Sequence, residues 1–128
     1  VDVSVDSFDH YTPSERTTLN MVRAADKYLP TIDRELKTLT RAAPTFDLCI
    51  YNAGMDPYEG CDIGGLSGIT SKVLAGRETM VFEWCQAHRI PIAFVLAGGY
   101  VGSRLTQEEL VLLHRSTIEA SPRDFAHS

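Results

Sequence analysis

Two short apolar runs constrain the fold of this chain more than any other feature. Residues 47–51 (Asp-Leu-Cys-Ile-Tyr) and 92–96 (Ile-Ala-Phe-Val-Leu) consist almost entirely of apolar side chains. Such continuous runs are typical of strands that are buried on both faces. A segment with helical periodicity lies between them, and further helical patterns flank the pair. Buried strands that alternate with helices predict a parallel sheet with right-handed crossover connections.

The remaining segments extend this alternation. Residues 1–5 alternate apolar and polar side chains, which predicts a first strand, and residues 8–17 have the composition of a loop. Helices are predicted over residues 26–41, 71–87 and 106–120. Asp26 is the predicted N-cap of the first helix, and Pro30 lies in its first turn. The third helix is predicted to begin with a capping box formed by Thr106 and Glu109. The expected fold class is α/β, a three-layer single domain over residues 1–128. Its parallel sheet has flanking helices, with strand and helix repeated three times. Three strands make a small sheet and leave a face open to a partner.

Composition excludes several classes of protein. The 128 residues suffice for one domain with a core, and a formal net charge of −5 without any Lys/Arg run argues against nucleic-acid binding. No apolar run approaches the roughly 20 residues that span a bilayer. The chain has three cysteines, Cys49, Cys61 and Cys85. Their number is odd and no two of them form a CxxC motif, which argues against a disulfide framework or a zinc finger. Cys49 and Cys85 are predicted core residues, Cys61 a loop residue, and the expected compartment is the reducing cytoplasm.

An acidic, glycine-rich segment follows the first apolar run. It contains Asp56, Glu59 and Asp62 within seven positions, together with four glycines and a proline. Carboxylates spaced this closely repel one another unless a positive group lies among them. Ligands of open α/β sheets bind at the carboxyl ends of the strands, where Asp56 is expected to lie. The residues alone leave two interpretations open: a solvated acidic loop, or a metal or ligand site.

The second apolar run also ends in an unusual segment. Gly98 and Gly99 permit positive φ angles or a close approach of the backbone to a ligand, and Tyr100 follows them directly. Taken alone, this pattern favours an ordinary Gly-Gly turn with a partly buried tyrosine. The alternative is a tyrosine whose hydroxyl projects over the strand ends. His10, beside Asp9 in the predicted loop, is interpreted as a surface residue rather than a catalytic one.

Both segments together resemble a known family. "YNAGMDPYEGCDIGGLSG" followed by "RIPIAFVLAGGY" is similar to the C-terminal half of the histone deacetylase superfamily, which includes acetoin-utilisation proteins and acetylpolyamine amidohydrolases. The class IV deacetylases and their bacterial relatives look most alike. The resemblance covers residues 43–100 well and implies the C-terminal portion of a domain with the arginase/deacetylase fold. Cys61 looks like a one-residue insertion relative to the family's Glu-Gly-Asp.

The resemblance implies roles for individual residues. Members of the family hydrolyse acetylated amines with a zinc ion held by two Asp and one His, a tandem His pair that assists the attacking water, and a Tyr that polarises the acyl carbonyl. Asp56 matches one zinc ligand and Tyr100 matches the catalytic tyrosine. The residues that match the substrate pocket are Asp62, Ile63, Gly64, Gly98 and Gly99. Ser4 and Val5 resemble a pair that helps to hold a structural potassium ion.

The other half of the family's machinery is absent from this sequence. Neither an Asp-x-His nor a His-His motif occurs. A catalytic zinc ion takes three protein ligands, and loss of a general base costs a factor of roughly 10²–10⁴. The implied function is thus the C-terminal part of a zinc-dependent deacetylase acting on N-acetylated amines, such as acetyl-lysine or acetylpolyamine. The chain alone is expected to be inactive or nearly so, so whether it is itself an enzyme stays open.

Three arrangements remain open for the missing residues. They can lie in an upstream half of the same domain or on a partner chain. A homodimer can complete the metal site, with His10 or His114 from the second copy. Alternatively, the chain is a non-catalytic binding or oligomerisation module of deacetylase ancestry. Neither nucleic acid nor a membrane is an expected partner in any of the three.

Overall fold

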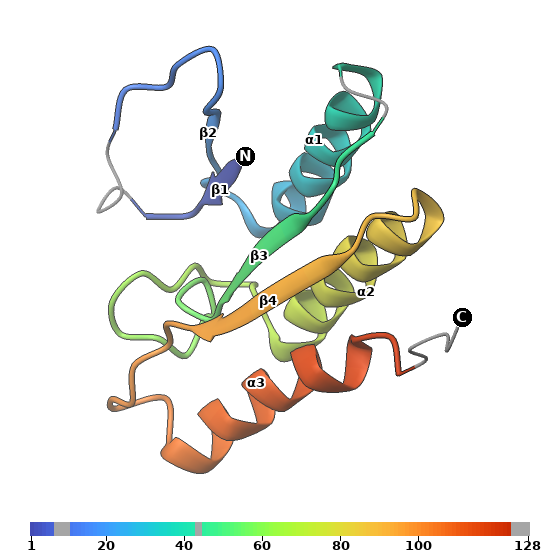
Figure 1. The fold of residues 1–128 in the computed structure, drawn as a ribbon. Helices are drawn as coiled ribbons and strands as arrows, with labels where there is room; N and C mark the ends of the chain where they lie inside the picture. The colour runs from blue at the N-terminus through green and yellow to red at the C-terminus, as the bar shows by residue number, and fades with distance from the viewer. Residues whose placement is uncertain (7–10, 43–44, 124–128) are drawn as a thin grey trace.

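The computed structural model describes residues 1–6, 11–42 and 45–123. Within these ranges the chain forms four strands, three α-helices and one short 3₁₀ turn (Figure 1). Their order and bounds are β1 (Asp2–Ser4), β2 (Leu19–Met21), η1 (Ala25–Lys27), α1 (Tyr28–Ala42), β3 (Cys49–Gly54), α2 (Ser71–Ala87), β4 (Ile92–Ala97) and α3 (Gln107–Ala120). The expected α/β class is confirmed.

The strands form two separate parallel pairs rather than one sheet. β1 pairs with β2 from Asp2↔Leu19 to Ser4↔Met21, and β3 pairs with β4 from Cys49↔Ile92 onward. Among the described residues no ladder joins the two pairs. The prediction of a single sheet of three strands is therefore wrong. β2 was missed because three residues are too few to show a periodic pattern.

The helices follow local signals in the sequence. α2 has the predicted bounds, and its N-cap Thr70 accepts a hydrogen bond from the Val73 amide at 3.3 Å. α3 begins with the predicted capping box, in which the Glu109 amide donates to Thr106 and the Thr106 amide donates to the Glu109 carboxylate. The predicted cap at Asp26 is wrong, because a 3₁₀ turn precedes α1 and starts without a side-chain cap.

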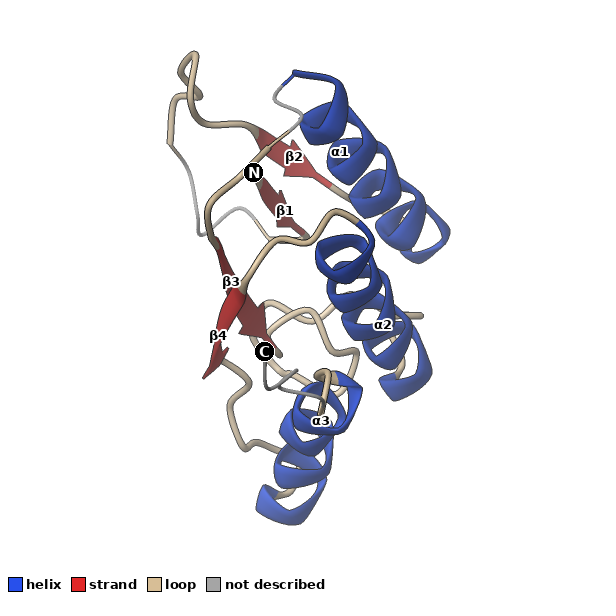
Figure 2. Cartoon of the chain, turned by 45° about the vertical axis from the view of Figure 1, so that its right-hand side comes forward, coloured by secondary structure: helices blue, strands red, loops and turns tan. Residues whose placement is uncertain are grey.

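All three helices lie on one side of the strands (Figure 2). The main core lies beneath α1, α2 and the loop after β3, and its fully buried members include Tyr28, Met55, Ile69, Leu74 and Leu105. The opposite face of the β3–β4 pair is open: Ile50 is 76% exposed and Val95 is 52% exposed. The prediction that both strands are buried on both faces is therefore wrong, and the third layer is not seen in the described part of the chain.

No helix within the described ranges is long and apolar enough to cross a membrane.

Candidate active-site fragment at the carboxyl ends of β3 and β4

Asp56 and the Gly98–Gly99 pair meet where β3 and β4 end. The Met55 amide donates to the Ala97 carbonyl at 2.9 Å, which extends the strand pairing by one residue and delivers Asp56 to the sheet's end. Gly98 and Gly99 adopt positive φ angles of 61° and 77°. The Gly99 amide donates to Asp56 Oδ1 at 3.2 Å, and a Cβ atom at residue 98 would overlap the Asp56 carboxylate. The two glycines thus allow the backbone to approach the carboxylate closely.

Asp62 ties the acidic loop to the segment after β4. Its carboxylate accepts hydrogen bonds from the Ser103 amide at 2.8 Å, from the Ser103 hydroxyl at 3.0 Å, and from Arg104 Nε at 3.2 Å. These donors, the Ser103 amide first, hold the pKa of Asp62 below its usual value. A Cβ atom at Gly102 would overlap this carboxylate as well. The contacts explain how acids so close in sequence coexist, since Asp62 has its own donors.

The other residues predicted for the substrate pocket lie around Asp56. Gly64 has a φ angle of 86°, and a Cβ atom there would lie 3.6 Å from the Asp56 Cβ. Ile63 is 62% exposed and Tyr100 is 65% exposed, so the Tyr100 side chain extends into solvent. The structure brings Asp56, Gly64, Gly98 and Gly99 together, with Tyr100 next along the chain.

Cys61 is a loop residue, as predicted, but it is buried beneath this cluster. Its thiol donates to the Met55 carbonyl at 3.5 Å. Burial raises the pKa of the Cys61 thiol, and the Tyr100 amide lowers it by a smaller amount. The thiol therefore joins the acidic loop to the residue that directly follows β3.

A buried ion pair that the sequence analysis missed anchors the end of β3. Arg77 and Glu78 of α2 are 5% and 0% exposed and form a salt bridge. Arg77 Nη1 donates to the Gly54 carbonyl at 2.6 Å and to the Tyr28 hydroxyl at 3.2 Å. Arg77 therefore fixes the backbone two residues before Asp56. The available signal was a charged pair in the middle of the apolar stripe of α2.

Electrostatics in this cluster favour a charged Arg77 and a neutral Tyr51. Burial acts to lower the pKa of Arg77, but Tyr28, Tyr51 and Glu78 together outweigh it and leave that pKa raised. Burial likewise raises the pKa of Tyr51, and the Arg77 charge opposes this only in part. Within the described part of the chain, the Tyr51 hydroxyl and Glu78 Oε2 have no hydrogen-bond partner of normal geometry.

The residues present do not by themselves fit a zinc ion. In residues 1–6, 11–42 and 45–123, no group of three His, Cys, Asp or Glu side chains is placed to hold a metal. Asp56 supplies one carboxylate, whereas catalytic zinc takes three protein ligands. His10 lies outside the described residues. His114 is partly buried on α3, with Nδ1 lacking a hydrogen-bond partner in the described part.

The Ser4–Val5 pair predicted for potassium lies on and just after β1. The Ser4 hydroxyl donates to Asp2 Oδ1 at 3.1 Å, and the Ser4 carbonyl accepts from the Val22 amide at 2.8 Å. Val5 packs against the core. The hydroxyl and the carbonyl of Ser4 thus both have protein partners, and the potassium site stays a prediction.

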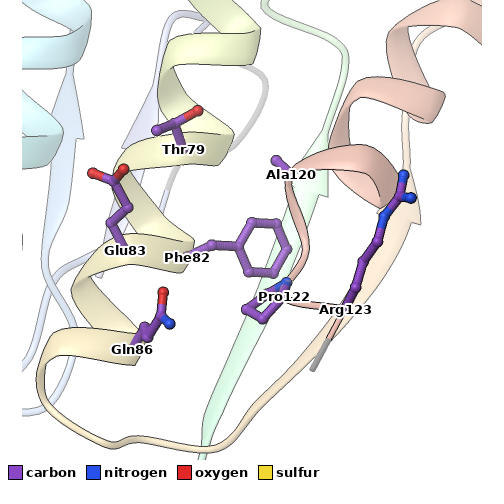
Figure 3. Close-up of a pocket in the computed structure, with 7 residues that line it drawn as sticks. All are labelled: Thr79, Phe82, Glu83, Gln86, Ala120, Pro122 and Arg123. Carbon is purple, nitrogen blue, oxygen red and sulfur yellow. The ribbon is translucent and has the colours of Figure 1, made fainter. Parts of the chain in front are cut away.

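A pocket of about 280 Å³ lies elsewhere, between α2 and the end of α3 (Figure 3). The ring of Phe82 points toward Pro122 across it, with Arg123 at its edge. It is lined by Thr79, Phe82, Glu83, Gln86, Ala120, Pro122 and Arg123. None of these residues belongs to the Asp56 cluster, so this pocket is separate from the strand ends where the candidate chemistry lies.

Comparison with known proteins supports deacetylase-like ancestry for part of the chain. No protein-family model matches it. Over 78 residues it is 35% identical to histone deacetylase 2 of Arabidopsis thaliana, a match that covers 61% of this chain and 20% of that protein. Over 75 residues it is 36% identical to an uncharacterised protein of Picosynechococcus sp., covering 59% of this chain and 24% of that protein. The chain therefore matches about a fifth to a quarter of these relatives, and the similarity indicates histone-deacetylase-like ancestry for the matched segment.

Proposed function

We propose that this chain contributes one part of the active site of a zinc-dependent, deacetylase-like hydrolase that acts on N-acetylated amines, with acetyl-lysine and acetylpolyamine as candidate substrates. The observation that carries the proposal is the contact between Asp56 and the Gly98–Gly99 segment at the carboxyl ends of two parallel strands. Ligands of open α/β sheets bind at this end. The similarity to histone deacetylase 2 supports the same direction.

The proposed roles follow from how the side chains are held. Asp56 is one metal ligand, kept in place by the Gly99 amide and by the close packing of Gly98. Tyr100 polarises the acyl carbonyl through its hydroxyl, for which its 65% exposed side chain has the freedom to meet a substrate. Ile63 and Gly64 line the approach of the substrate. Asp62 acts as a positioning residue, because it fixes the loop that follows Tyr100.

The remaining metal ligands and the general base come, in this proposal, from another segment of a deacetylase-like domain or from a partner chain. The open face of β3 and β4 supports this part of the proposal. Parallel sheets occur almost only with both faces covered, yet here Ile50 and Val95 face solvent. A complementing segment that covers this face would supply the third layer as well as the missing ligands.

A segment exchange tests the proposal. The matched 78-residue segment of Arabidopsis histone deacetylase 2 is replaced by the corresponding segment of this chain, and hydrolysis of an acetyl-lysine peptide is measured. We expect the chimera to retain activity. Tyr100→Phe and Asp56→Asn should each lower kcat/KM by at least about 10²-fold, the scale of one lost stabilising group. Glu83→Gln, an exposed change on α2, is the matched control and should leave activity unchanged.

A chimera that folds with an unchanged circular dichroism spectrum but has no activity would refute the proposed roles. Loss of activity in the Glu83→Gln control would instead mean that the chimera does not tolerate substitutions in this segment in general. Zinc titration of the chain alone gives a second test. We expect only weak binding that Asp56→Ala does not alter, because one carboxylate is far from a complete ligand set.

The open β3–β4 face also favours a second candidate function, a non-catalytic module that associates through this face with a second copy. Ile50, at 76% exposure, is the most exposed large apolar side chain on it. Light scattering over a range of protein concentrations would then give a dimer that Ile50→Lys dissociates. A monomer at all concentrations would rule this candidate out, and it would leave the deacetylase proposal standing.

A further inference from the structure

Two of the three cysteines, Cys49 and Cys85, lie where β3 packs against α2. Cys49 is the first residue of β3 and Cys85 lies in the last turn of α2. Strand alternation puts Cys49 on the face of β3 that carries Tyr51, whose ring meets Phe82 edge-on at a centroid distance of 6.2 Å. Cys85 follows Phe82 by three residues and therefore lies on the same face of α2. Ring contacts and periodicity alone thus bring the two cysteines together.

Backbone contacts support this placement independently. The Ile90 amide donates to the Cys85 carbonyl at 2.9 Å, and the Cys49 amide donates to the Pro91 carbonyl at 2.8 Å. Two consecutive residues in the connection from α2 to β4 are therefore hydrogen-bonded to the two cysteines, Ile90 to Cys85 and Pro91 to Cys49. Cys49 also lies close enough to Cys85 to be among the groups that raise the pKa of the Cys85 thiol.

We propose that Cys49 and Cys85 are an oxidation site that closes to an intramolecular disulfide by exchange with a small-molecule disulfide, of which oxidised glutathione is the probe. In the first step the Cys49 thiolate attacks one sulfur of oxidised glutathione, forming a mixed disulfide and releasing one glutathione thiolate. In the second, the Cys85 thiolate attacks the Cys49 sulfur and releases the second glutathione thiolate. The protein loses two protons and two electrons, and one molecule of oxidised glutathione becomes two of reduced glutathione.

Accessibility sets the order of these steps. Cys49 is partly exposed and can meet a solute, whereas Cys85 is 1% exposed and cannot. Burial, together with the neighbouring Cys49, raises the pKa of Cys85 to about 12. A thiol of this pKa attacks a solute slowly at neutral pH, but it can still resolve a disulfide held against it.

Cys61 provides an internal comparison, because it is equally buried and belongs to a different part of the fold. Its thiol bonds to the Met55 carbonyl and lies beneath the Asp56 cluster. It has no cysteine among its contacts in the described residues and should stay reduced.

The test treats the folded, reduced chain with oxidised glutathione, quenches the exchange with acid, alkylates the remaining thiols in denaturant, and maps the peptides without reduction. We expect a linked pair of peptides carrying Cys49 and Cys85, and alkylation at Cys61 alone. Cys85→Ser should stop the reaction at the glutathione adduct of Cys49, Cys49→Ser should prevent both steps, and Cys61→Ser, the matched control, should leave the linked pair unchanged.

The wild-type map alone can overturn the proposal, so the test does not depend on the variants folding. Three alkylated thiols after treatment, a link that includes Cys61, a disulfide between two chains, or a stable glutathione adduct on wild-type Cys49 would each refute it. None of these outcomes bears on the deacetylase proposal, which involves neither Cys49 nor Cys85.

Discussion

Replacing Arg77 by methionine should destabilise the chain more than breaking any of the exposed ion pairs in the described residues. Arg77 and Glu78 are both almost completely buried, and the guanidinium also donates to the Gly54 carbonyl and the Tyr28 hydroxyl. Arg77→Met leaves the Glu78 charge buried without its partner, which costs about 3–5 kcal/mol. The Gly54 carbonyl loses its side-chain donor, at a cost of about 1–3 kcal/mol.

These costs are large against the total stability of a small domain, about 5–15 kcal/mol. Urea unfolding followed by circular dichroism measures them. We expect Arg77→Met to lower the free energy of unfolding by at least about 3 kcal/mol. The double variant Arg77→Met/Glu78→Leu removes the unpaired charge and should recover most of that loss, but not the part due to the Gly54 carbonyl.

The exposed pair Arg115–Glu119 on α3 is the matched control. Its N–O distance of 2.6 Å is also short, but its side chains are 65% and 50% exposed. Arg115→Met should therefore cost no more than about 1 kcal/mol. The reasoning fails if Arg77→Met costs as little as Arg115→Met, or if the double variant is no more stable than Arg77→Met.

Three further predictions concern the loops and α3. Gly98→Ala should destabilise the fold by about 1–3 kcal/mol or more in thermal unfolding, because φ is 61° and the new Cβ overlaps the Asp56 carboxylate; Gly76→Ala on α2 is the control. The lowered pKa of Asp62 means that its contribution to stability is present above the unfolded pKa of about 3.9 and is lost as pH falls toward the folded value. Asp62→Asn should therefore flatten the decline of the unfolding free energy below about pH 4 in acid titrations, and an unchanged slope would contradict this. Thr106→Ala removes the capping box and should cost about 1 kcal/mol in urea unfolding, whereas Gln107→Ala should cost little.

Local signals in the sequence were sufficient to predict the helices and the strand-end motifs. α2 has the predicted bounds, and α3 begins at the predicted capping box, because side chain-to-backbone bonds within four residues decide where a helix starts. The positions of Asp56 and of Gly98–Gly99 just after two apolar runs predicted that these residues follow parallel strands. The register of β3 with β4 confirms that they do.

Long-range contacts were not predictable from the same patterns. Asp62 meets Ser103 across 41 residues, and Arg77 reaches the Gly54 carbonyl across 23. Charged residues are ordinarily assigned to the surface, so nothing local marks Arg77 as buried except its position in an apolar stripe. These contacts hold the acidic loop and the end of β3 in place.

The sequence by itself determined the three helices and the strands β1, β3 and β4, since strand and helix periodicity are encoded within a few residues, but it did not show the three-residue strand β2. Only the tertiary structure decided which face of each strand is covered. Tyr51 and Ile50 are neighbours in the same apolar run, yet Tyr51 packs against Phe82 while Ile50 is 76% exposed. An apolar run indicates that a strand can be buried on both faces. Whether it is buried depends on which other segments are present to cover it, and that is a property of the assembled layers.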